Sequence, residues 1–214
     1  NFNRGLFDAS LKARYVAALM AEVDHAGTGC RAQADTVYFG GGTPSLLEPA
    51  EVAAILDTCR RAFDIASDAE VTIEANPETV DVERLAGFRS AGVNRVSYGV
   101  QSFREEELRR LSRLHNVQRA RAAVPDARRA GVDNLSVDLM MWLPGQQVDQ
   151  WLDSVDQAID VSPEHISLYL LEVYPNAPLK DEMARANWSQ APDDDAAAMY
   201  MGAMTSAAPT PKPP

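Results

Sequence analysis

The chain has 214 residues, 46% of them hydrophobic, and a formal net charge of −11 at pH 7. This length allows one large α/β domain or two small ones with a sizeable core. The acidic balance argues against a nucleic-acid partner, which usually needs a basic patch. No apolar run approaches the ~20 residues of a membrane span, and residues 1–5 lack the apolar core of a signal peptide, so we expect no integral membrane protein. Nothing in the sequence requires a disulfide between the two cysteines, which favours a protein of the reducing cytoplasm.

Hydrophobic periodicity and turn residues predict alternating helices and strands. Helices are expected at residues 11–27, 49–63, 81–92, 108–114, 116–131, 151–159 and 193–204, and strands at 36–39, 71–75, 95–100, 135–139 and 165–171. Asp81 can cap its helix and Gly92 can end it, while Pro125 should kink its helix or mark the true start. The proline-rich residues 208–214 are expected to be extended or disordered.

Strict alternation implies right-handed strand–helix–strand units and a parallel sheet covered by helices. The opening helix has no strand before it, which suggests that a first strand is missing. Five visible strands and one lost strand would make six. Asn1 stands where an initiator Met would be, so we expect a cut or processed chain.

Polar residues gather at the ends of the predicted strands. Residues 40–43 (Gly-Gly-Gly-Thr) follow the first strand, Glu74 ends the second, and Gln101, Asp138 and Glu172 lie at or after the next three. The carboxyl ends of parallel strands are where ligands bind, and glycines let a ligand approach the main chain. Each residue has another interpretation: Glu74 and Asp138 could cap helices, and Gln101 could satisfy its own loop. Together they nevertheless predict one shared polar site.

Arg113 is the available cation near that edge. It interrupts the apolar face of residues 111–115. A bidentate guanidinium suits a carboxylate ligand, and a surface salt bridge is the alternative.

Seven segments, in this order, resemble the radical S-adenosylmethionine (SAM) superfamily, in the branch of oxygen-independent coproporphyrinogen III oxidase and the haem chaperone HemW. They are residues 40–45, 74–77, 92–97, 99–103, 111–115, 137–140 and 143–146. The resemblance runs from about Phe7 to about Pro178. Asn76 and Ser102 favour HemW, because the oxidases tend to carry Asp at these two positions.

The resemblance implies a partial (β/α)6 TIM-like barrel that lacks its first strand, with an incomplete core over residues 1–207 and a tail over 208–214. It also implies that SAM is the ligand of the shared site. Glu74 and Asp138 would accept from the ammonium or the ribose hydroxyls, and Arg113 would pair with the carboxylate. The implied contacts are Gly41, Gly42, Thr43, Glu74, Gln101, Arg113, Asp138 and Glu172.

The chain departs from the family in its cysteines. Members hold a [4Fe–4S] cluster with Cys-x3-Cys-x2-Cys after the first strand, and Cys30 and Cys59 cannot replace that motif. We therefore expect no metal ligands and no catalytic residues in this chain, and no SAM cleavage by it alone. Trp142 stands where the family usually has Gly, and would narrow the mouth of the site or merely cover the barrel rim. The latter is slightly favoured.

Three functions remain open at this point. The first is the SAM-binding core of a HemW-like haem chaperone, whose intact form would bind SAM, a [4Fe–4S] cluster and haem. The second is a fragment of the oxidase, in which a 5′-deoxyadenosyl radical would act on porphyrinogen propionates. The third is an inactive barrel fragment. SAM, and haem or porphyrin in the intact protein, are the expected partners.

Overall fold

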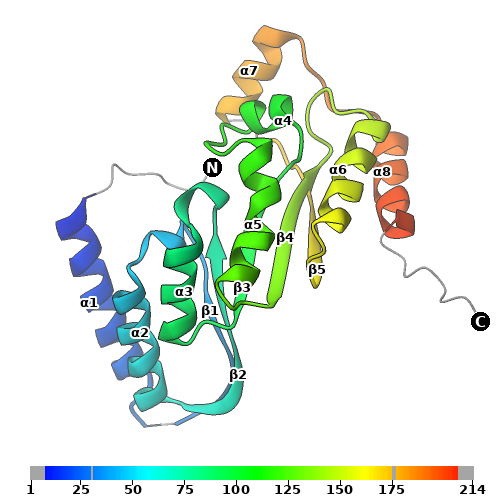
Figure 1. Cartoon of the computed structure of the whole chain (residues 1–214). Coiled ribbons are helices and arrows are strands. Elements are labelled where there is room, and N and C mark those ends of the chain that lie inside the picture. The colour runs from blue at the N-terminus through cyan, green and yellow to red at the C-terminus, as the bar shows by residue number, and fades with distance from the viewer. Residues whose placement is uncertain (1–7, 30, 175–176, 207–214) are drawn as a thin grey trace, which may run out of the picture. The chain divides into compact units, whose positions relative to one another are not determined.

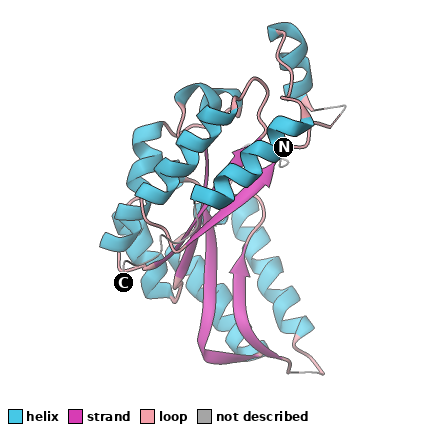
Figure 2. Ribbon diagram, turned by 90° about the vertical axis from the view of Figure 1, so that its right-hand side faces the viewer, coloured by secondary structure: helices cyan, strands magenta, loops and turns pink. Residues whose placement is uncertain are grey.

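A computed structural model describes residues 8–29, 31–174 and 177–206, and shows each strand followed by a helical segment (Figures 1 and 2). The strands are β1 (Gln33–Phe39), β2 (Asp64–Ala75), β3 (Arg95–Gln101), β4 (Asn134–Met141) and β5 (His165–Leu170). The helices are α1 (Ala9–Ala26), α2 (Pro49–Ala62), α3 (Val82–Ala91), α4 (Glu105–Arg110), α5 (Val117–Arg129), α6 (Val148–Asp160), α7 (Pro178–Ala186) and α8 (Asp193–Ser206), with 3-10 turns η1 (Pro44–Leu46) and η2 (Pro77–Thr79). No helix among these residues is long and apolar enough to cross a membrane.

The strands form one five-stranded sheet in the order β1-β2-β3-β4-β5. β1 pairs with β2 in parallel, with Phe39 opposite Ile73, and β4 pairs with β5 in parallel, with Asp138 opposite Ser167. The predicted α/β alternation is confirmed. It arises because short β-branched runs such as residues 71–73 end at turn residues, after which helical periodicity resumes.

Contacts divide the chain into two compact units. The first unit comprises Asn1–Ser97 and Asp126–Leu135. In it, α2 contacts both α1 and α3. Its core includes Val52, Leu56, Ile73, Leu85 and Phe88, all fully buried.

The second unit comprises Tyr98–Pro125 and Ser136–Pro214. In it, α6 packs against α8, and the fully buried Trp151 of α6 donates its indole N–H to the Met199 carbonyl at 2.9 Å. A buried indole needs such a partner. This one fastens α8 to the rest of the unit.

Local signals set several helix ends as the sequence predicts. The Asp81 carboxylate accepts from the Arg84 N–H at 2.8 Å and caps α3, and Gly92 ends that helix with a φ of 113°. Pro125 lies inside α5 and does not mark its start. The helix predicted over 108–114 is wrong in its bounds. α4 ends at Arg110, because Ser112 takes a left-handed φ of 53° that an α-helix cannot continue through.

The sequence missed α7 and the first seven residues of β2. Residues 64–70 show no strict apolar alternation, and their pairing with β1 shifts register between Ala34 and Thr36. The predicted disordered tail, 208–214, lies outside the described residues.

Candidate functional site

The glycine loop after β1 holds the carboxylate of Glu74. The Gly41 N–H donates to Glu74 Oε2 at 3.1 Å, and the Tyr38 hydroxyl donates to Oε1 at 2.9 Å. Gly41 and Gly42 have φ values of 83° and 63°, and a Cβ added at either would meet no atom within 4 Å. The left-handed backbone at both positions therefore favours glycine, and the space beside the two residues is open. Glu74 binds this loop and does not cap a helix.

Thr43 begins the short turn η1 that follows the glycines. Its carbonyl accepts from the Leu46 N–H at 3.1 Å, and its half-buried side chain makes no capping hydrogen bond. The Ser45 and Thr79 hydroxyls, 2.6 Å apart, join η1 to η2. The loops after β1 and β2 are thus tied together within the first unit.

Gln101, the last residue of β3, has two unfavourable features. Its φ is 72°, and its buried Oε1 has no hydrogen-bond partner. A non-glycine residue in this conformation and a buried unsatisfied acceptor are both uncommon, and they recur at functional sites. Its side-chain oxygen does not satisfy its own loop, and it suits a ligand that brings a donor.

The other three candidates also belong to the second unit. Arg113 is half-buried and lies just beyond α4, where its N–H donates to the Leu108 carbonyl at 2.9 Å. Asp138 is half-buried in β4. Glu172 is exposed and accepts from the Tyr174 hydroxyl at 2.8 Å, a contact that raises the pKa of Tyr174.

Polar side chains continue along one face of individual strands. In the first unit, Arg95 of β3 donates to the Thr72 hydroxyl at 3.3 Å and lies 3.8 Å from the Glu70 carboxylate. Because side chains alternate along a strand, Glu74 shares its face of β2 with Glu70 and Thr72, and Gln101 shares its face of β3 with Arg95. Glu74 and Gln101 therefore each continue a row of polar residues on their own strands.

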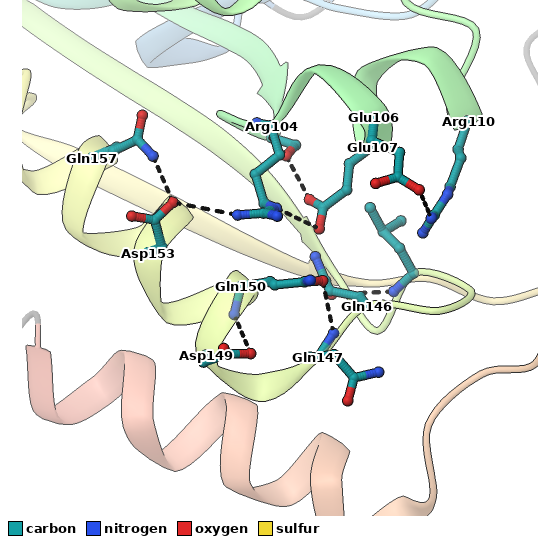
Figure 3. A network of polar contacts seen from close by, with 12 residues as sticks. Arg104, Glu106, Glu107, Arg110, Gln146, Gln147, Asp149, Gln150, Asp153 and Gln157 are labelled. Carbon is teal, nitrogen blue, oxygen red and sulfur yellow. Dashed lines mark hydrogen bonds and ion pairs between the residues drawn. The ribbon is translucent and has the colours of Figure 1, made fainter.

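Sequence reasoning missed Glu107, which lies at the centre of a network in the second unit (Figure 3). Its side chain is only 2% exposed, and it accepts from the Ser102 hydroxyl at 2.5 Å. Arg104 Nε lies 3.8 Å from its other oxygen. Burial raises the pKa of this carboxyl, and the Ser102 hydrogen bond offsets part of that effect. In the sequence, Glu107 ends an acidic run that is typical of a solvated helix start.

The cysteines do not fit a cluster. Cys59 is half-buried in α2, and burial raises the pKa of its thiol. Cys30 lies outside the described residues. The residues that are described contain no group of three His, Cys, Asp or Glu side chains placed to hold a metal. Two cysteines are also fewer than the three of the family's motif.

Comparison with known proteins agrees with this geometry. Residues 11–158 match the Radical SAM superfamily. The heme chaperone HemW of Haemophilus influenzae is 42% identical over 161 residues, which cover 75% of this chain and 41% of that protein. The HemW of Mycobacterium tuberculosis is 41% identical over 183 residues, which cover 85% and 47%. A Bos taurus relative, radical S-adenosyl methionine domain-containing protein 1, mitochondrial, is 41% identical over 177 residues, which cover 81% and 39%.

The structure of coproporphyrinogen III oxidase (HemN) from Escherichia coli matches with a TM-score of 0.81 at 24% identity, over 96% of this chain and 48% of that one. That likeness defines the fold class, a partial α/β barrel of the radical SAM type. The chain belongs to the Radical SAM superfamily. The predicted resemblance is confirmed, and the chain spans less than half the length of these relatives.

Proposed function

We propose that this chain is the SAM-binding core of a HemW-like haem chaperone. The observation that carries the SAM assignment is Gln101, a strained residue with an unsatisfied buried acceptor at a strand's carboxyl end. The chaperone assignment rests on the identity of 42% and 41% to two HemW proteins. Because the chain covers only part of their length, haem binding and a cytoplasmic location belong to the proposal. The assignment of residues 1–207 to one incomplete radical SAM core is also part of the proposal.

The proposed roles follow from the chemistry of each group. Gly41 and Gly42 present open main chain, and Glu74 keeps lone pairs beyond the two that Gly41 and Tyr38 use. The Glu74 and Asp138 carboxylates would accept from the SAM ammonium or the ribose hydroxyls. Thr43, Gln101, Arg113 and Glu172 complete the proposed contacts, with Arg113 pairing with the SAM carboxylate.

The residues of this chain do not account for an iron–sulfur cluster. Members of the family bind SAM together with a [4Fe–4S] cluster, but the two cysteines of this chain cannot supply three thiolate ligands. We therefore assign no reaction step to the residues of this chain. Their proposed work is to bind SAM and to orient it.

Titration calorimetry with SAM tests the binding proposal. Glu74→Gln and Asp138→Asn remove one charge in each unit, and each should raise the Kd at least tenfold, as expected for a charged hydrogen bond. Glu70→Gln is the matched control. It removes a carboxylate from the same face of β2, four residues from Glu74, and should leave the Kd unchanged. Equal affinities in all variants would refute the assignment.

The alternative is a fragment of the oxygen-independent oxidase, which the fold match to HemN keeps open. Haem titration and a coproporphyrinogen III decarboxylation assay on the full-length protein separate the two. Haem binding without decarboxylation supports the chaperone. Decarboxylation of coproporphyrinogen III would refute the chaperone proposal and favour the oxidase.

A further inference from the structure

The segment between α7 and α8 lies against the ends of two strands. This segment, residues 188–191 (Trp-Ser-Gln-Ala), is called the strap below. The Gln190 side-chain amide donates to the carbonyls of Trp142, just after β4, and Leu171, just after β5, at 3.2 and 3.0 Å. One side chain therefore bridges the carboxyl ends of both strands.

The strap is also held from the loop after β4. The Trp142 indole N–H donates to the Ala191 carbonyl at 2.9 Å, and the Gly145 N–H donates to the Ser189 carbonyl at 2.9 Å. Together with the two bonds from Gln190, these give the strap four hydrogen bonds, which involve Ser189, Gln190 and Ala191. A connection of four residues with four such bonds is fixed far more firmly than an ordinary surface loop.

Arg110 adds a third attachment. Its guanidinium lies over the Trp188 ring, 4.6 Å from the ring centroid, and donates to the Pro144 carbonyl at 2.7 Å. The Arg110 side chain is only 13% exposed, which favours a strong cation–π contact. One cation thus joins α4, the loop after β4 and the strap.

The backbone at Trp142 indicates that this attachment has a role. Its φ is 64°, a conformation that is strained for any residue with a Cβ and unusual for a bulky one. The indole that occupies this strained position supplies the bond to Ala191. A residue kept in a costly conformation while it makes a specific contact is typical of a functional constraint.

We propose that Trp142 and Gln190 are positioning residues, which latch the strap across the carboxyl ends of β4 and β5. The latch fixes the end of β4, three residues beyond Asp138, and the segment just after β5 that carries Glu172. Its effect on ligand affinity rests on the proposed SAM site, whereas the latch itself does not. Trp142 therefore anchors a second segment of the chain through its indole N–H.

Hydrogen–deuterium exchange on the full chain without SAM tests the latch. Trp142→Phe keeps an aromatic ring and loses the N–H, and Gln190→Ala loses both bridging bonds. Each should speed exchange at the Gly145 amide, whose acceptor is in the strap, about tenfold. Trp151→Phe is the matched control, because it deletes an indole bond to α8 and none to the strap. Unchanged exchange at Gly145 in both latch variants would overturn the proposal.

A second measurement separates the latch from the proposed function. If both hold, Trp142→Phe raises the SAM Kd several-fold. If the wild-type protein binds no SAM, the proposed function fails, and the exchange result still decides the latch. An unchanged SAM Kd in a variant with faster exchange would show that the latch has no role in binding.

Discussion

At the scale of single residues, the second unit has five described non-glycine positions with positive φ, and three of them lie at the end of β3 or in the segments after β3 and β4. The other two, Ser162 and Asn187, follow helices α6 and α7. Gln101, Ser112 and Trp142 all have positive φ without being glycine. Gln101 ends β3, Ser112 precedes Arg113, and Trp142 follows β4. Backbone strain of this kind costs on the order of 1–3 kcal/mol per residue and persists only where the surroundings hold it. At Gln101 this strain coincides with an unsatisfied buried acceptor, which supports a binding role for that residue.

Glu107 gives a prediction with a defined sign. Its pKa is raised above the ordinary value of 4.5, chiefly by burial. The folded state therefore holds the proton more tightly, and stability falls as pH rises from 4.5 through the raised pKa. Glu107→Gln keeps an acceptor for Ser102 and removes the buried charge. It should increase the free energy of unfolding at pH 7.5, and the gain should disappear near pH 4.

Urea denaturation at the two pH values measures this effect. Glu83→Gln, at an exposed position in the first turn of α3, is the control and should change little at either pH. A Glu107→Gln protein less stable than wild type at pH 7.5 would mean that the carboxylate's contacts with Ser102 and Arg104 outweigh the cost of its burial.

At the scale of elements, α3 depends on both of its ends. Asp81→Ala removes the acceptor for the Arg84 N–H and should lower the free energy of unfolding by about 1 kcal/mol, as other N-cap deletions do. Chemical denaturation gives the value. Asp57→Ala removes an exposed carboxylate paired with Arg60 at 3.2 Å and should cost less than about 0.5 kcal/mol. If both variants lose the same free energy of unfolding, the Asp81 cap stabilises the fold no more than an exposed ion pair does.

The elements that could be predicted were those with local signals. Asp81 and Gly92 bound α3 through side-chain and backbone chemistry that is visible in the sequence. By contrast, the start of β2 depends on pairing with β1, and α7 has no buried residue to create a periodic pattern. The end of α4 depends on the left-handed conformation of Ser112, and serine is not a residue type that predicts such a conformation.

The candidate site was predictable to a similar degree. Glu74 and the glycines stand out because a charge and three glycines at strand ends are unusual, and the structure shows them in contact. The roles of Glu107 and of the strap were not foreseen. The strap depends on contacts between segments distant in sequence, such as Trp142 with Ala191. Glu107 was missed because its acidic run looks like a solvated helix start, although its side chain is buried.

At the scale of the whole molecule, the eight proposed SAM contacts divide between the units. Gly41, Gly42, Thr43 and Glu74 belong to the first unit, and Gln101, Arg113, Asp138 and Glu172 to the second. If SAM contacts all of them, its addition should slow amide exchange at residues 40–43 and also at 101–103. Exchange mass spectrometry measures both segments at once. Protection confined to one segment would remove the other unit's residues from the site.

The carboxylate of Glu74 has a further consequence for how this protein can change over evolutionary time. Its two oxygens each have a separate partner, Gly41 and Tyr38, on a loop and a strand that precede it by more than thirty residues. Aspartate is one methylene shorter, and phenylalanine at position 38 lacks the hydroxyl. Either change alone breaks the hydrogen bond between the two side chains, which is exposed, so water can replace the lost partner. Because Glu74 also holds the Gly41 N–H and is a proposed SAM contact, position 74 should vary less than position 38 in descendants of this sequence.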